Sequence, residues 1–162
     1  MDNQEITILA TQLGAALKGR GLTLATAESC TGGGIAEAVT RISGSSAWFD
    51  CAFVSYSYEA KTAMLGVHRD TLLDCGAVSE ETAREMADGA IARSRAQVAV
   101  AVTGIAGPSG GMPDKPVGTV WFAWKFPKKP VITEVCHFNG DRDAIRNQTI
   151  VHALNKLLHN LA

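Results

Sequence analysis

Residues 27–34 hold the side chains best placed to do chemistry. This stretch turns an apolar, strand-like run (22–26) directly into a helix-like run, and Ser29 lies at the turn. The first backbone N–H groups of a helix attract anions, because they lack intrahelical partners and carry the positive end of the helix dipole. Two interpretations follow. Either Ser29 is a nucleophile whose developing oxyanion meets these N–H groups, or Ser29 and Thr31 cap the helix.

A second strand-to-helix junction carries further reactive groups. Residues 48–56 are rich in aromatic and β-favouring types, and Ser57 is a good N-cap for a helix over 58–65. If this strand shares a sheet with the first one, Tyr56, Tyr58 and Lys61 lie at the same sheet edge as Ser29.

The elements that must position these residues follow from apolar periodicity. We expect helices over 6–20, 33–41, 58–65 and 70–74, one beginning at Ser79 and one after Asp141. We expect strands over 22–26, 48–56, 98–102, 117–125 and 131–138. The link 126–130 is short, so the last two strands should pair antiparallel. The order predicts a three-layer α/β/α sandwich around a mixed sheet of about five strands, with residues 1–162 forming one domain.

Two further segments are candidates for ligand contact. A glycine-rich loop (103–111) follows the buried strand 98–102, and such a loop lets backbone N–H groups approach a ligand closely. It matches neither the P-loop nor the dinucleotide fingerprint, so a mobile surface loop is the alternative. Arg142 and Arg146 lie in the first turns of the last helix, where the dipole opposes them. They need an anionic ligand or a salt bridge to an acid.

Composition excludes several classes of function. The chain has 15 Lys+Arg against 16 Asp+Glu, which gives no basic field for nucleic acid. No apolar run reaches membrane-spanning length and the first residues do not resemble a signal peptide, so we expect a cytoplasmic protein that does not bind membranes. A homo-oligomer is compatible with these features.

The cysteines and histidines do not form a recognisable metal motif. The four cysteines are widely spaced and have no histidine at ligand spacing, so no metal site is expected. Cys30 lies at a helix N-terminus, which can activate a thiol, so a cysteine hydrolase is a third hypothesis. The four histidines are interpreted as structural or surface residues.

Several segments together resemble the CinA C-terminal family. They are TAESCTGG (26–33), VSYSYEAK (54–61), GAVS (76–79), GIAGP (104–108), KPVGTV (115–120) and GDR (140–142). The resemblance covers nearly the whole chain. Members of this family are nicotinamide-nucleotide amidohydrolases, found alone or fused to a competence/damage-inducible protein.

The resemblance implies hydrolysis of the carboxamide of nicotinamide mononucleotide, which yields nicotinate mononucleotide and ammonia and returns pyridine nucleotides to cofactor synthesis. The family's serine nucleophile matches Ser29, its lysine matches Lys61, and its tyrosine at the end of the second strand matches Tyr56. Relatives commonly have Asn where this chain has Tyr58. This departure keeps open an alternative, a catalytically silent paralogue that binds a nucleotide or another ligand.

For amide hydrolysis, neutral Lys61 would accept the proton of Ser29 and later protonate the leaving nitrogen. Burial beside a cationic pyridinium ring would lower the pKa of Lys61 enough for this role. With no triad histidine in view, a Ser-Lys pair is the simplest arrangement. The oxyanion would be stabilised by the backbone N–H groups of Cys30, Thr31, Gly32 and Gly33.

The rest of the substrate would need other contacts. The ring could be held by the aromatic face of Tyr56 or Tyr58. Two sets of phosphate donors remain open, the loop residues (Thr103, Gly104, Ile105, Ala106 and Gly107) or the arginine pair (Arg142 and Arg146). Glu28 would orient Lys61 or a ribose hydroxyl, or its carboxylate would interact with the positive end of the helix dipole. The mechanism requires no metal and no organic cofactor, and the expected partner is a small nucleotide.

Overall fold

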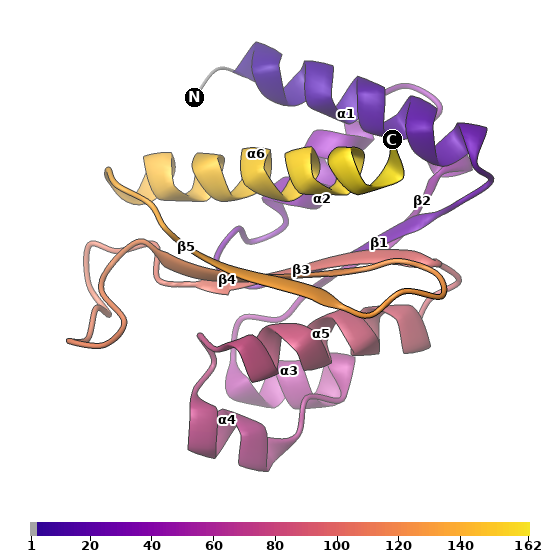
Figure 1. Cartoon of the computed structure of the whole chain (residues 1–162). Coiled ribbons are helices and arrows are strands. Elements are labelled where there is room, and N and C mark those ends of the chain that lie inside the picture. The colour runs from indigo at the N-terminus through magenta and orange to yellow at the C-terminus, as the bar shows by residue number, and fades with distance from the viewer. Residues whose placement is uncertain (1–2) are drawn as a thin grey trace.

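The computed structural model describes residues 3–162, which form a three-layer α/β/α sandwich around a five-stranded mixed sheet (Figure 1). The strands are β1 (Leu24–Glu28), β2 (Phe49–Val54), β3 (Val98–Gly104), β4 (Thr119–Lys125) and β5 (Ile132–His137). The helices are α1 (Asn3–Gly19), α2 (Gly34–Thr40), α3 (Tyr58–Leu65), α4 (Arg69–Cys75), α5 (Glu80–Ala92) and α6 (Arg142–Leu161), with a short 3-10 turn, η1 (Ser45–Ala47). The predicted fold class is confirmed.

The sheet has the order β2-β1-β3-β4-β5. The first three of these strands run parallel, and β4 and β5 are antiparallel to their neighbours, as the short hairpin link predicted. The chain leaves β1 toward β2 and then returns across β1 to reach β3. In open α/β sheets, ligands bind at the carboxyl ends of the strands where the strand order reverses in this way.

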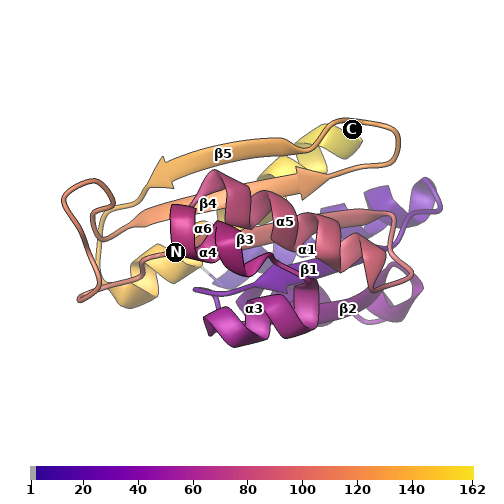
Figure 2. The ribbon, with the colours of Figure 1, turned by 90° about the horizontal axis from the view of Figure 1, so that it is seen from below.

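Two apolar clusters lie on opposite faces of the sheet. Helices α1, α2 and α6 cover one face, and α3, α4 and α5 cover the other (Figures 1 and 2). The first cluster is built from large side chains such as Leu13, Phe122 and Trp124. The second is dominated by alanines, and Gly89 lets α5 approach α3 so closely that an added Cβ would lie 1.9 Å from the Leu65 carbonyl oxygen. Close packing on this side sets the position of α3.

Most differences from the predicted elements are shifts at their ends. Strand β1 runs to Glu28 rather than to residue 26, and β3 continues to Gly104 because Thr103 and Gly104 pair with β4. Strand β2 is shorter at both ends than the predicted 48–56. The predicted cap at Ser57 and the predicted helix starts at Ser79 and Asp141 are confirmed, because each of these side chains accepts a hydrogen bond from the backbone N–H three residues on. No helix among residues 3–162 is long and apolar enough to span a membrane.

Candidate active site

The Ser29 hydroxyl and the Lys61 ammonium meet at the carboxyl end of β1. Ser29 follows the last residue of this strand, and Lys61 reaches it from the first turns of α3, with 3.0 Å between Nζ and Oγ. Nζ also donates to the Ser55 carbonyl oxygen at 2.8 Å. Only 1% of Lys61 is exposed, and this burial lowers its pKa to about 8. A sizeable fraction of Lys61 is therefore neutral near pH 8 and able to accept a proton.

The turn around Ser29 is fixed by the backbone. The Ser29 N–H donates to the Val102 carbonyl of β3, and the Gly32 N–H donates back to the Ser29 carbonyl. Gly32 and Gly33 both have positive φ (58° and 97°), which side chains other than glycine rarely adopt. The two glycines therefore allow the tight reversal that leads from Ser29 into α2.

Backbone donors surround this turn. The N–H of Gly32 donates to the Ser29 carbonyl oxygen. Among residues 3–162, the N–H groups of Cys30, Thr31 and Gly33 donate to no other residue. The N–H of the residue after a nucleophile is a common oxyanion donor on strand-turn-helix elements. The Cys30 N–H is in that position.

Glu28 has a different role from the one expected for substrate contact. It is fully buried, and its carboxylate accepts hydrogen bonds from the hydroxyls of Thr26 and Thr31 and from the backbone N–H groups of Ile35 and Ala36. The carboxylate thus caps α2 from the preceding strand. The interpretation of Ser29 and Thr31 as caps is wrong, because neither side chain accepts a hydrogen bond from the N–H groups of α2. Glu28 interacts with the N-terminus of this helix instead, which was one of the alternatives predicted for it.

Cys30 lies in an environment that suppresses thiolate formation. Only 4% of it is exposed, and burial raises the pKa of its thiol to about 12. A thiol nucleophile must ionise near neutral pH. Burial therefore argues against Cys30 as the nucleophile, because the helix N-terminus does not compensate for it.

Tyr56, Arg142 and Gly107 bring three predicted segments together. The Arg142 guanidinium donates to the Tyr56 hydroxyl at 2.9 Å and to the Gly107 carbonyl at 2.8 Å. Tyr56 is 61% exposed and makes no hydrogen bond to Ser29 or Lys61. Arg142 also lines a hollow of about 270 Å³ together with Asp141 and Asp143, whose carboxylates oppose an anionic ligand there.

Arg146 lies one turn further along α6 and faces the Ser29 turn. Its guanidinium donates to the Thr31 carbonyl at 2.9 Å, and a side chain at Gly32 would come within 3.3 Å of it. Its buried Nε has no hydrogen-bond partner among residues 3–162. The Arg146 guanidinium therefore lies against the turn, with its Nε enclosed by the protein.

The glycine loop is placed differently from the predicted phosphate cradle. The Thr103 hydroxyl donates to the Ala77 carbonyl, the Ile105 N–H donates to the Thr119 carbonyl, and Gly104 packs against β4. These contacts tie the three residues to the edge of the sheet. Ala106 and Gly107 remain near Arg142, on the side where the loop after β3 extends beyond the sheet (Figure 1).

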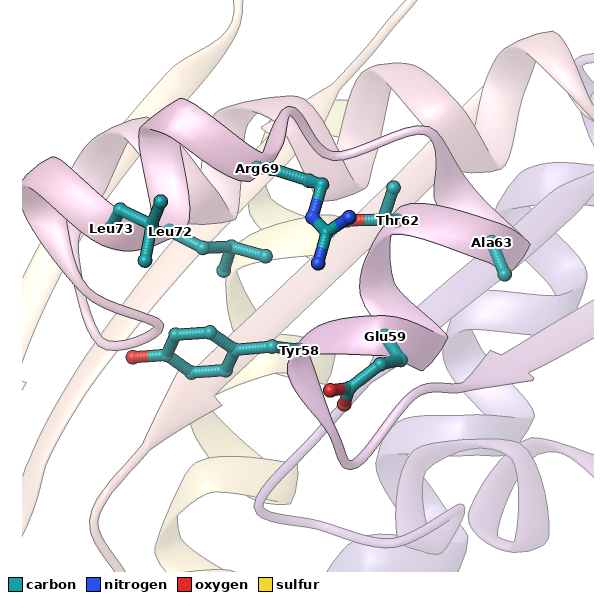
Figure 3. A pocket seen from close by; sticks show the side chains of 7 residues that line it. All are labelled: Tyr58, Glu59, Thr62, Ala63, Arg69, Leu72 and Leu73. Carbon is teal, nitrogen blue, oxygen red and sulfur yellow. The ribbon is translucent and has the colours of Figure 1, made fainter.

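Tyr58 lies at the start of α3, where 45% of it is exposed. It lines a pocket of about 400 Å³ between α3 and α4, with its ring beside Leu72 and Leu73 (Figure 3). Neither Ser29 nor Lys61 lines this pocket. The contact between Ser29 and Lys61 is thus present in a chain that has Tyr58 at this position.

Ser55 is a site residue that the sequence did not single out. Its carbonyl holds Lys61, and its own hydroxyl is buried without a partner among the described residues. The only available signal was its place at the end of β2 beside Tyr56.

Comparison with known proteins identifies close relatives. A family model described as CinA C-terminal domain matches residues 6–161. Nicotinamide-nucleotide amidohydrolase PncC of Escherichia coli K12 is 53% identical over 157 residues, covering 97% of this chain and 95% of that protein. PncC of Pseudomonas putida is 54% identical over 153 residues, covering 94% of this chain and 95% of that protein.

Solved structures agree with this match. The crystal structure of the competence/damage inducible protein CihA from Agrobacterium tumefaciens superposes with a TM-score of 0.93 at 48% identity, covering 96% of this chain and 94% of that chain. A CinA superfamily protein from Escherichia coli gives a TM-score of 0.93 at 39% identity, covering 99% of this chain and 93% of that chain.

Proposed function

The chain belongs to the CinA C-terminal domain family, and we propose that it hydrolyses the carboxamide of nicotinamide mononucleotide to nicotinate mononucleotide and ammonia. The observation that carries the proposal is the buried contact of 3.0 Å between Lys61 Nζ and Ser29 Oγ. A nucleophile and a base within hydrogen-bond distance are the arrangement that acyl transfer requires. The names of relatives that match nearly their full length supply the substrate.

The first half of the reaction forms an ester on Ser29. Neutral Lys61 takes the hydroxyl proton as Oγ attacks the carboxamide carbon, and the carbonyl oxygen becomes an oxyanion. We assign the N–H groups of Cys30, Thr31 and Gly33, which follow Ser29 and donate to no other residue in the described part of the chain, as donors to this oxyanion, and one such donor contributes about 3 to 4 kcal/mol in other enzymes. The Lys61 ammonium then gives its proton to the leaving nitrogen, and ammonia departs.

The second half repeats these steps with water. Lys61, neutral again, removes a proton from water as the oxygen attacks the ester carbon. The protonated lysine returns the proton to Ser29 Oγ as the nicotinate leaves. The Ser55 carbonyl keeps one N–H of Lys61 engaged throughout and so fixes the direction of its lone pair. Only side chains and backbone donors of this chain are needed in these steps.

We assign the substrate phosphate to Arg146 rather than to the hollow beside Arg142. The Arg146 guanidinium lies next to the Ser29 turn, where it donates to the Thr31 carbonyl, whereas two acidic residues, Asp141 and Asp143, line the hollow. Arg142 instead holds the Tyr56 hydroxyl, so that the tyrosine ring is available to the pyridinium. The predicted pair of arginines therefore divides into a phosphate contact and a positioning residue.

The test is product analysis with the purified protein. Incubation with nicotinamide mononucleotide should release one ammonia per nicotinate mononucleotide formed. Nicotinamide riboside, which lacks the phosphate, should react with a KM at least about tenfold higher. Calorimetric binding of the mononucleotide without turnover would instead support the silent paralogue.

A further inference from the structure

Three metal-ligating side chains converge on the face of the sheet opposite α5, in a place that the proposed reaction does not use. The atoms are a carboxylate oxygen of Glu134, the Sγ of Cys136 and a ring nitrogen of His152, and all lie within 4.8 Å of one another. Glu134 and Cys136 are two residues apart on β5, so their side chains leave the same face of the strand. His152 faces them from the middle of α6.

Packing restricts the orientation of His152. Its ring contacts the rings of Phe122, Trp124 and Phe138, with centroids 4.8, 5.8 and 6.2 Å away. Nε2 is thereby directed at the Glu134 carboxylate, 2.5 Å from Oε1. Metal sites gain affinity when their ligands are held in place before the ion binds. The aromatic rings provide this support for the imidazole.

We propose that Glu134, Cys136 and His152 bind a divalent ion of the zinc class, with solvent as the fourth ligand. Oxygen, sulfur and imidazole nitrogen together suit the borderline-soft Zn²⁺, whereas Mg²⁺ and Ca²⁺ prefer oxygen alone. All three residues are half-buried, so an ion can enter from solvent and retain a water. Such a site would tie edge strand β5 to α6.

Two local features oppose the ion and define the test. Burial and the Glu134 carboxylate raise the pKa of the Cys136 thiol to about 11, so binding must displace a proton from sulfur. Lys156 lies 3.9 Å from Glu134 Oε2 and repels a cation. Removal of this charge should therefore tighten binding, an effect that no purely structural role for the cluster predicts.

The experiment is titration of the reduced protein with Co²⁺, followed by competition with Zn²⁺. One equivalent of Co²⁺ should produce the near-ultraviolet band of a cobalt-bound thiolate, and Zn²⁺ should abolish it. C136A should remove the band. His152→Phe, which preserves the aromatic packing, should weaken binding about tenfold or more, and Lys156→Gln should tighten it severalfold.

The matched control is C51A, because Cys51 also has a carboxylate nearby, with its Sγ 3.8 Å from Asp50 Oδ2, but no histidine. This variant should bind Co²⁺ like the wild type. Zn²⁺ should also raise the melting temperature of the wild type and of C51A but not of C136A. A band that survives C136A, weaker binding in Lys156→Gln, or no saturable binding by the folded wild type would overturn the proposal.

Discussion

Lys61 meets two opposing demands, because the burial that makes it a base also costs folding free energy. Its folded-state pKa of about 8 lies below the ordinary value of 10.5. The folded protein thus releases this proton at a lower pH than the unfolded chain does. The lowered pKa provides a neutral amine 3.0 Å from the Ser29 hydroxyl. At neutral pH, however, the buried ammonium lowers the free energy of unfolding, because it has lost its hydration.

Activity should therefore rise with pH. We expect log kcat/KM for the mononucleotide to increase with unit slope and to level off above an apparent pKa of about 8, since only neutral Lys61 accepts the Ser29 proton. The inflection in kcat should fall at lower pH, because the bound pyridinium disfavours the ammonium further. Ammonia release measured between about pH 6 and 9 checks this prediction, and a flat profile would contradict it.

The same shift makes a prediction about stability. Because the folded-state pKa is lowered, the wild type should gain stability relative to Lys61→Met as pH rises from about 8 to 10.5, by up to about 3 kcal/mol at about 1.4 kcal/mol per pKa unit. Below pH 8 the difference in the free energy of unfolding between Lys61→Met and the wild type should stay at its full value, in favour of the variant. Urea denaturation of both proteins at each end of this window is the measurement. A stability difference that does not change with pH would show that Lys61 titrates normally.

At the scale of elements, the sequence predicted which segments fold and where most helices begin, but not every contact that holds their ends. Apolar periodicity and side-chain caps placed every helix and strand of the sandwich to within a few residues. For Glu28, interaction with the helix dipole was one of the predicted alternatives. Its hydrogen bonds to the N–H groups of Ile35 and Ala36 were not predicted, because these lie seven and eight residues further along the chain and capping rules consider adjacent residues. The pairing of Lys61 with Ser29 was predicted from the shared sheet edge and from the family resemblance, and the structure has the two groups 3.0 Å apart.

Replacement of Glu28 tests its role as a cap. The carboxylate accepts four hydrogen bonds, whereas the amide of Glu28→Gln has one acceptor oxygen and turns its NH₂ toward donors. We expect a loss of about 3 kcal/mol in the free energy of unfolding. Glu37→Gln on the exposed side of the same helix, where the pair with Arg41 is solvated, should change it by about 0.5 kcal/mol or less. Equal effects of the two changes would refute the buried cap.

Gly89 tests how the second helical layer positions Lys61. The methyl group of Gly89→Ala would collide with the Leu65 carbonyl at the end of α3, so α3 must shift, at a cost of about 1 to 3 kcal/mol. Because α3 carries Lys61, kcat should fall even where the variant is fully folded. Gly19→Ala, where a methyl group meets nothing within 4 Å, should leave kcat unchanged. An unchanged kcat in folded Gly89→Ala would show that the packing of α3 against α5 does not position Lys61.

At the scale of the molecule, one sheet separates two cores and gathers the candidate site at its carboxyl edge. The fold class followed from the order of elements. The partners of Arg142 and Arg146 could not be predicted, because α6 follows the site segments by about a hundred residues and only the folded chain shows which side chains it meets. For the same reason, the Glu134, Cys136 and His152 cluster was not visible in sequence spacing.

We propose that both cores belong to one domain and unfold together. Trp124 lies in the first core and Trp121 packs against the second, so tryptophan fluorescence reports both faces of the sheet. Its urea transition should coincide with the transition in far-ultraviolet circular dichroism. Two separated transitions would show that the helical layers unfold independently.

The measurement that tests the central claim most directly is ammonia release from nicotinamide mononucleotide by the wild type, S29A, K61A and C30A. The account predicts turnover by the wild type, a loss of at least about a thousandfold in both S29A and K61A, and retained turnover in C30A, with folding of each protein verified by circular dichroism. Activity within tenfold of the wild type in folded S29A or K61A would contradict it.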